Sequence, residues 1–107
     1  MVNAGIKISS MSQVPKVPMI IVHNLVQARA VLAVASQHNR PVLLRSPEAT
    51  SAAIGPAIFV ETTKLARASY PEGFGGAIFD CGTEAGLAIA AIRYGGCHII
   101  VNTASET

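Results

Sequence analysis

The sequence predicts a single α/β domain built on a parallel sheet. Short apolar segments rich in β-branched residues alternate with segments whose apolar residues recur at helical spacing, in the order β-α-β-α-β-α-β. The chain has 107 residues, enough for one core, and we find no linker or tandem repeat in it. We therefore expect residues 1–107 to form one domain of four parallel strands and three helices, with right-handed crossovers.

The first strand and the first helix are predicted between residues 17 and 37. The segment VPMIIV, residues 17–22, is apolar and β-branched, which favours a buried strand, whereas the residues before it are polar and irregular. Asn24 is a good helix N-cap, and apolar residues recur at helical spacing from Leu25 to Gln37. Pro41 ends this helix, because the residue before a proline disfavours the α region.

The second strand and the second helix follow. Val42–Leu44 is a short apolar strand, and the loop Arg45–Ser51 after it carries polar turn residues. We place the second helix at Pro56–Ser69, because proline is tolerated in a first helical turn.

The last strands and helix occupy residues 71–101. Pro71 and the glycines of Gly73–Gly76 predict a turn, and Gly76–Phe79 predicts the third strand. A third helix, Thr83–Tyr94, ends at Gly95, and Cys97–Val101 is the fourth strand. The strand order stays open: it is either the barrel-like order 1-2-3-4 or an open flavodoxin-like order with the first strand inside the sheet.

The composition of the chain indicates which partners to expect. Half of the residues are hydrophobic and 13% are charged, so a globule this small has little interior for its apolar groups. We therefore expect a homo-oligomer, a dimer or higher, whose interface covers a face or an edge of the sheet. The eight basic residues are scattered, which predicts no nucleic-acid partner.

The distribution of apolar and basic residues along the chain predicts a protein that neither crosses a membrane nor carries a secretory signal. No apolar run reaches the length of a membrane span, and the first residues lack a basic segment followed by an apolar core. We therefore expect a cytoplasmic protein with no membrane partner, in which Cys81 and Cys97 are free thiols. In a parallel arrangement these two cysteines lie at opposite ends of adjacent strands, too far apart for a disulfide.

Polar residues gather where the predicted strands end. Asp80 and Cys81 follow the third strand, Arg45 and Ser46 follow the second, and His23 follows the first. Ligands bind at the carboxyl ends of parallel strands, so these residues predict a small-molecule site near Asp80. In it Arg45 and Ser46, with Thr50 and Ser51 of the same loop, hold a carboxylate or phosphate, and His23 is a ligand or proton carrier. The alternative is structural, with Asp80 capping the next helix and Cys81 packing as a small apolar group.

Two long segments resemble a known enzyme family. VPMIIVHNLVQARAVLAVASQHNRPVLLRSPEA and FDCGTEAGLAIAAIRYGGCHIIVN are similar to the first strands and helices of class II, zinc-dependent fructose-bisphosphate and tagatose-bisphosphate aldolases. The resemblance covers about Val17 to Asn102 and implies the first half of a (β/α)8 barrel.

The resemblance implies roles for individual residues. It makes Asp80 the acid/base, and it places Cys81 where the family has a zinc-ligating histidine, a position that a thiolate can also fill. It also places Asn102 where the family has the aspartate that ends the fourth strand, and Ile21 where many members have an asparagine. The other zinc ligands and the phosphate loops of the family belong to the second half of the barrel, so we expect that one copy of this chain cannot build the whole site.

Two functional interpretations follow. The first is a truncated class II aldolase-like protein that binds a small carbonyl or phosphorylated ligand near Asp80, through Arg45, Ser46 and Asn102. In it Cys81 and His23 are the candidate zinc ligands, and lyase activity requires an oligomer that completes the site. The second is a non-catalytic structural or interaction module that retains the fold.

Overall fold

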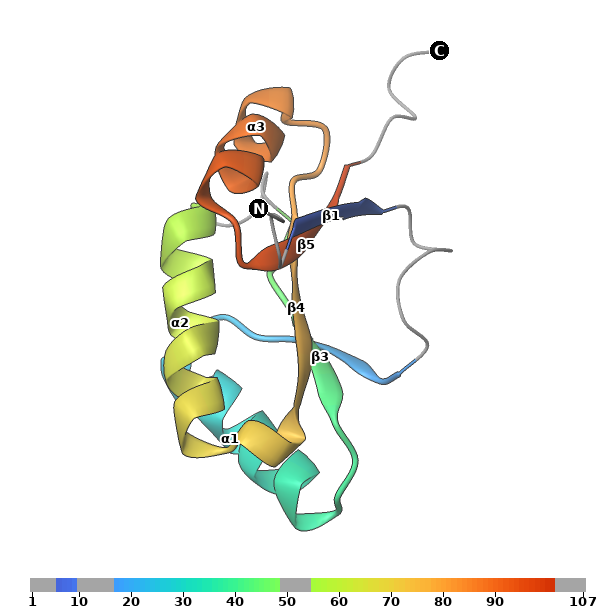
Figure 1. Ribbon diagram of the computed structural model, residues 1–107, viewed down its shortest axis with the longest axis vertical. Helices are drawn as coiled ribbons and strands as arrows, with labels where there is room; N and C mark the ends of the chain where they lie inside the picture. The colour runs from blue at the N-terminus through green and yellow to red at the C-terminus, as the bar shows by residue number, and fades with distance from the viewer. Residues whose placement is uncertain (1–5, 10–16, 49–54, 102–107) are drawn as a thin grey trace, which may run out of the picture.

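The computed structural model describes residues 6–9, 17–48 and 55–101, and the strands in these ranges form one parallel sheet (Figure 1). The order across the sheet is β1-β5-β4-β3-β2, so β4 lies at its centre. The strands are β1 (Ile6–Ser9), β2 (Met19–Ile21), β3 (Val42–Arg45), β4 (Phe74–Asp80) and β5 (Cys97–Ile100).

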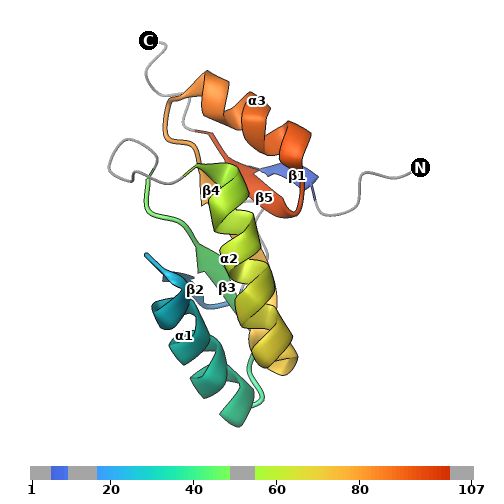
Figure 2. The same ribbon diagram turned by 90° about the vertical axis from the view of Figure 1, so that its left-hand side faces the viewer.

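Three α-helices lie side by side on one face of this sheet (Figures 1 and 2). They are α1 (Leu25–Gln37), α2 (Pro56–Ser69) and α3 (Ala85–Tyr94), and a short 3-10 helix, η3 (Pro71–Gly73), follows α2. Each α-helix joins two neighbouring parallel strands, and the connections all step across the sheet in the same direction. Crossovers of one hand then place every helix on the same face.

The strand order answers the question that the sequence left open. The four predicted strands are parallel and lie in sequential order, β2-β3-β4-β5. The flavodoxin-like alternative requires the first predicted strand to lie inside the sheet. That strand is β2, and it lies at the edge with β3 as its neighbour.

The sheet has a fifth strand, β1, in addition to the four that the sequence predicts. The start of the chain was expected to be irregular, but Ile6–Ser9 pairs in parallel with β5, from Ile6 opposite Cys97 to Ser9 opposite Ile100. A four-residue strand carries little local signal, and its partner lies about 90 residues further along the chain. Long-range pairing of this kind is decided by tertiary structure and not by local propensity.

The first helix forms as predicted. The side chain of Asn24 accepts a hydrogen bond from the backbone N–H of Gln27 at 2.9 Å, which satisfies one of the orphan donors of the first turn. Helix α1 then runs from Leu25 to Gln37 and buries Ala28, Leu32 and Ala35.

Helices α2 and α3 also match their predictions closely. Helix α2 has Pro56 in its first turn and occupies exactly the predicted range. Helix α3 begins at Ala85, two residues later than predicted, and ends at Gly95, whose φ of 83° suits a glycine.

β4 begins earlier than predicted and contains a bulge. Phe74 and Gly75, predicted to lie in the turn before the strand, belong to β4: Val42 pairs with Phe74, and the next residue, Leu43, pairs with Gly76. Gly75 is therefore an extra residue in β4, and Gly76 has a φ of 144°, which disfavours any side chain.

Side chains on the two faces of the sheet form separate clusters. On the helix face, residues of β3, β4 and β5 pack against all three helices, with Phe59 of α2 and Phe79 of β4 at 5.9 Å between ring centroids. On the opposite face, which we call the distal face, Leu43, Ile78 and Ile100 form a second buried cluster with Met19 packed against it.

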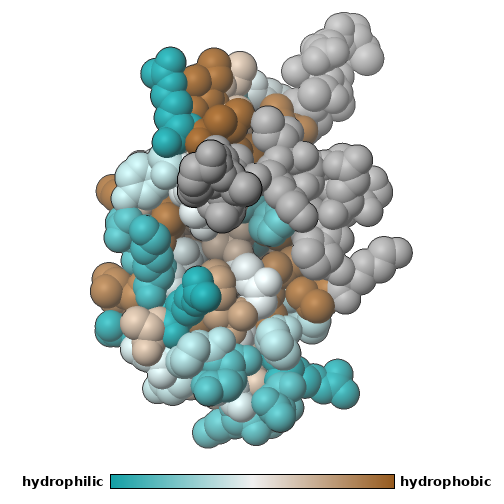
Figure 3. Space-filling model, viewed as in Figure 1, coloured by the Kyte–Doolittle hydropathy of each residue, from teal (hydrophilic) through white to brown (hydrophobic). Residues whose placement is uncertain are grey.

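The described surface is polar at one end and more apolar at the other. In Figure 3 the lower end, where α1 turns into β3, is mostly hydrophilic, and hydrophobic residues appear at the upper end, where Figure 1 places α3. Helix α3 carries an exposed apolar side chain, Ile89, with 53% of its surface exposed. In the ranges that the structure describes, we find no helix with the length and hydropathy needed to cross a membrane.

A close backbone approach predicts the effect of one glycine substitution. A Cβ on Gly73 would lie 2.4 Å from the backbone oxygen of Leu32, so η3 and α1 would have to separate. We expect Gly73→Ala to lower the free energy of unfolding by about 1–3 kcal/mol, measured by urea denaturation. Gly86→Ala in α3 is the control: its Cβ meets nothing within 4 Å, so stability should stay unchanged or rise by up to about 1 kcal/mol. Equal stability of the two variants would contradict the packing described for η3.

Candidate functional site

An ion pair joins two of the predicted site residues at the carboxyl ends of β3 and β4. Nη2 of Arg45 lies 2.5 Å from Oδ2 of Asp80. The side chains are 23% and 9% exposed, so the pair is largely withdrawn from water. A mostly buried pair of this kind is costly to break, because removing one partner leaves the other charge uncompensated.

The bulge in β4 is what places these two side chains on one face. Because Gly75 adds one residue, Arg45 pairs with Ile78, and Asp80 lies two residues beyond Ile78 on the same side of the strand. In a regular ladder that continued from the Val42–Phe74 pair with no bulge, Arg45 would pair with Ala77, and Asp80 would then point to the opposite face from Arg45.

Further hydrogen bonds hold both the side chain and the backbone of Asp80. Oδ1 of Asp80 accepts a hydrogen bond from the N–H of Gly82 at 2.9 Å, and the N–H of Asp80 donates to Oγ of Ser46 at 2.9 Å. Helix α3 has Glu84 as its N-cap residue, so Asp80 does not cap the helix as the structural alternative expected. It closes a tight Asx turn instead.

Arg45 retains hydrogen-bonding capacity. Within the described ranges its Nη1 donates only to the thioether sulfur of Met19, a weak acceptor, at 3.7 Å. Its Nε is buried and has no hydrogen-bond partner among the described residues. A buried donor without a partner costs free energy, so this guanidinium is a favourable place for an additional acceptor.

Cys81 lies on the other face of the sheet from Asp80. It is fully buried in the cluster between sheet and helices, where it packs as a small apolar group, as the structural alternative predicted. Burial, with smaller contributions from the charge of Asp80 and from Cys97, raises the pKa of the Cys81 thiol to about 11. The protonated thiol is therefore the stable form at neutral pH, whereas zinc requires the thiolate.

His23 is held apart from both residues. It lies exposed between β2 and α1, where its backbone N–H donates to Oε1 of Gln27 at 2.8 Å and its Nδ1 lies 3.2 Å from the same oxygen. Across the described ranges, His, Cys, Asp and Glu side chains nowhere gather in a group of three that could hold a metal ion. The structure therefore brings together Arg45, Ser46 and Asp80, but it does not bring His23 or Cys81 to them.

The remaining candidates fall outside the described residues. Asn102, predicted as a ligand-binding residue, follows the last described position, Val101, and Thr50 and Ser51 of the polar loop lie in the range 49–54.

Sequence reasoning missed two contributors to the site. Gly82 donates to Asp80, and the spacing Asp-x-Gly, typical of turns, is the signal that could have found it. Met19 contacts Arg45 across 26 residues of sequence, and no local pattern marks that contact.

Comparison with known proteins does not assign a family. No family model, no curated protein and no solved structure matches the chain.

The two cysteines predict how stability changes at alkaline pH. Both are free thiols, as predicted, and burial raises the pKa of each from 9.0 to about 11. The folded state favours the neutral thiol, so its contribution is complete below pH 9 and is lost as the pH rises towards 11. We expect urea denaturation between pH 8 and pH 10.5 to show a loss of up to about 2 kcal/mol for each thiol.

The control removes the titrating groups. The double variant Cys81→Ala, Cys97→Ala should be less stable at pH 8 but should lose less stability between pH 8 and pH 10.5 than the unmodified protein. Identical losses in the two proteins would show that other groups cause the alkaline dependence.

Proposed function

We propose that this protein binds a small carbonyl or phosphorylated compound at the carboxyl ends of β3 and β4, with Arg45 as the residue that holds the oxyanion. The observation that carries the proposal is the incomplete bonding of Arg45, whose Nη2 holds Asp80 while its buried Nε has no partner among the described residues. A guanidinium presents five donors in a planar fork, which suits carboxylate and phosphate oxygens.

In this proposal Asp80 orients the guanidinium in the free protein. An arriving oxyanion approaches the donors of Arg45 that Asp80 does not use, and it weakens the hold of Arg45 on Oδ2. Oδ1 stays fixed by the N–H of Gly82, so the carboxylate keeps its position when Oδ2 is released. Asp80 would then be available as a proton acceptor beside the bound compound, the role that the aldolase resemblance implies.

Zinc has no part in the proposed step. The two metal-ligand candidates do not fit one ion with Asp80, because the Cys81 thiol is buried on the helix side and His23 is held by Gln27. Lyase chemistry of the aldolase type would need further groups from a second chain. In that case the half-barrel is completed by a partner that approaches the distal face, where Asp80 and Arg45 lie.

A structural role is the second candidate. It is favoured by the bonding of Asp80, both of whose carboxylate oxygens already have donors, and by the Ser46 hydroxyl that accepts from the Asp80 backbone. The network would then serve only to hold β3 against β4 in a non-catalytic interaction module.

Ligand titration distinguishes the two candidates. We expect dihydroxyacetone phosphate, which carries both a carbonyl and a phosphate, to bind with a measurable Kd in calorimetry. Arg45→Lys keeps a positive charge beside Asp80 but loses the planar fork, so it should weaken binding by roughly tenfold or more. Arg29→Lys, at an exposed position of α1, is the matched control and should bind as the unmodified protein does.

The opposite results would favour the structural candidate. These are absence of binding at millimolar ligand, or equal Kd values for the unmodified protein and Arg45→Lys. In either case Asp80→Asn should still lower the free energy of unfolding, by about 1–3 kcal/mol, because the network stabilises the fold whether or not it binds a ligand.

We also propose that the protein is a cytoplasmic homo-oligomer. Ile21, beside Arg45 in the sheet register, is 52% exposed, and Val26, Ile58 and Leu65 on the helices are more than half exposed. Light scattering at micromolar concentration should give the mass of a dimer or larger assembly. Ile21→Asp should shift the mass towards the monomer, because the partner is proposed to cover the distal face. A monomer in the unmodified protein would contradict the proposal.

A further inference from the structure

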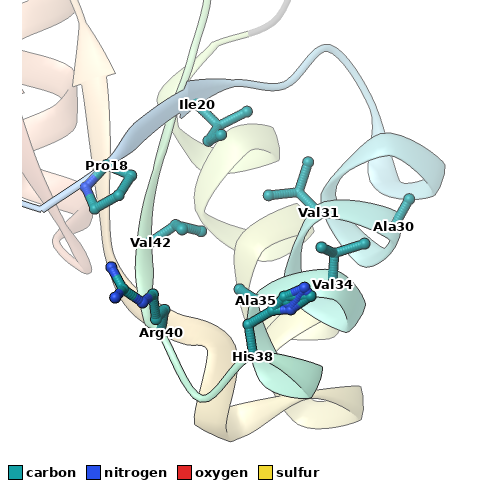
Figure 4. Close-up of a pocket in the computed structure, with 9 residues that line it drawn as sticks. All are labelled: Pro18, Ile20, Ala30, Val31, Val34, Ala35, His38, Arg40 and Val42. Carbon is teal, nitrogen blue, oxygen red and sulfur yellow. The ribbon is translucent and has the colours of Figure 1, made fainter.

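A groove runs along the outer edge of the sheet, between β2 and α1, away from the Arg45–Asp80 network. Its volume is about 510 Å³. Figure 4 shows Ile20 of β2, Val42 of β3 and Pro18, which precedes β2, on one side of it, and Val31 and Val34 of α1 facing them. The complete lining is Pro18, Ile20, Ala30, Val31, Val34, Ala35, His38, Arg40 and Val42.

The walls are apolar because α1 presents a second apolar stripe. Its buried residues face the sheet, while Ala30, Val31 and Val34 lie on the flank that extends beyond β2. β2 is the last strand on this side of the described sheet, so no further strand or helix of the described ranges covers the flank. Val34 is 57% and Ile20 is 37% exposed as a result.

One end of the groove is basic. His38 and Arg40 come from the turn between α1 and β3, and Figure 4 shows both at the lower end of the lining. Their side chains form no hydrogen bond or ion pair with a described residue, and no acidic side chain lines the groove. An anionic group at this end would therefore meet a guanidinium for which no described residue competes.

The size and the lining together define a class of ligand. Small-molecule sites commonly have volumes of about 300–1,000 Å³ and combine apolar walls with a few polar groups that fix orientation. We propose that this groove binds an amphipathic monocarboxylate, such as a medium-chain fatty acid. The hydrocarbon tail lies between Ile20 and Val34, and the carboxylate lies at Arg40 with His38 beside it.

This groove is separate from the proposed oxyanion site at Arg45 and Asp80. Arg45 points to the distal face, whereas Val42 and Ile20 line the groove on the helix face, and Val42 lies about 10 Å from Arg45 along β3. The groove can therefore bind its ligand whether or not Arg45 binds an oxyanion.

Decanoate is a suitable probe, with decanol as the control that has the same tail and no charge. We expect heteronuclear NMR titration, below the micelle concentration of decanoate, to shift amide signals of residues 18–20 and 30–42 with saturation. Decanol should bind at least several-fold more weakly, because it cannot form the charge-assisted contact with Arg40.

Paired variants test the orientation of the ligand. Arg40→Gln should weaken decanoate binding by roughly three- to tenfold and leave decanol unchanged, since the site is exposed and partly screened. Arg29→Gln, an equally exposed arginine of α1 outside the groove, should change neither. Val34→Asp, at an exposed position where the fold tolerates a polar group, should abolish decanoate binding.

Three results would overturn the proposal. The first is the absence of saturable shifts with decanoate, and the second is equal binding of decanoate and decanol. The third is a change of the same amide signals when the protein is diluted without ligand, if Val34→Asp removes that change. The last would mean that a second copy of the chain occupies the groove.

Discussion

One extra residue in the central strand governs the arrangement of the protein. Gly75 shifts the pairing of β4 with β3 by one position, and every later residue of β4 changes the face to which it points. The shift places Asp80 beside Arg45 on the distal face and aligns Ala77, Phe79 and Cys81 with the helix face. Glycine suits the position because a Cβ on Gly75 would lie 3.0 Å from the backbone oxygen of Val42, and Gly76 takes a φ that few side chains tolerate.

The alternation along β4 separates two neighbours that the aldolase resemblance assigns to one active site. Asp80 faces an ion pair, a hydroxyl and a turn amide, whereas Cys81 faces the apolar layer between sheet and helices. A carboxylate and a thiol that are adjacent in sequence thus lie in environments of opposite polarity. Burial accordingly favours the neutral thiol, while the carboxylate accepts hydrogen bonds from the guanidinium and from the Gly82 amide.

Placing all three helices on one face leaves the edges of the sheet with different properties. At the β2 edge α1 extends its apolar flank past the last strand, which forms the groove that ends at His38 and Arg40. The polar network lies instead at the carboxyl ends of β3 and β4. The two proposed sites therefore use different chemistry on opposite faces of the sheet: a charged pair with spare donors on the distal face, and an apolar groove with a basic end on the helix face.

The sequence by itself determined the elements whose signals are local. Helical spacing, the Asn24 cap, the first-turn proline at Pro56 and the terminal glycine at Gly95 defined three helices to within two residues, and apolar β-branched runs defined four strands. It also placed Arg45, Ser46 and Asp80 at the carboxyl ends of the second and third predicted strands, while the tertiary structure made these strands neighbours. Only the tertiary structure decided the β1–β5 pair, the bulge, the contact of Met19 with Arg45 and the opposite orientations of Asp80 and Cys81. These features depend on register between segments far apart in the chain, and register is set by long-range packing that no local pattern encodes.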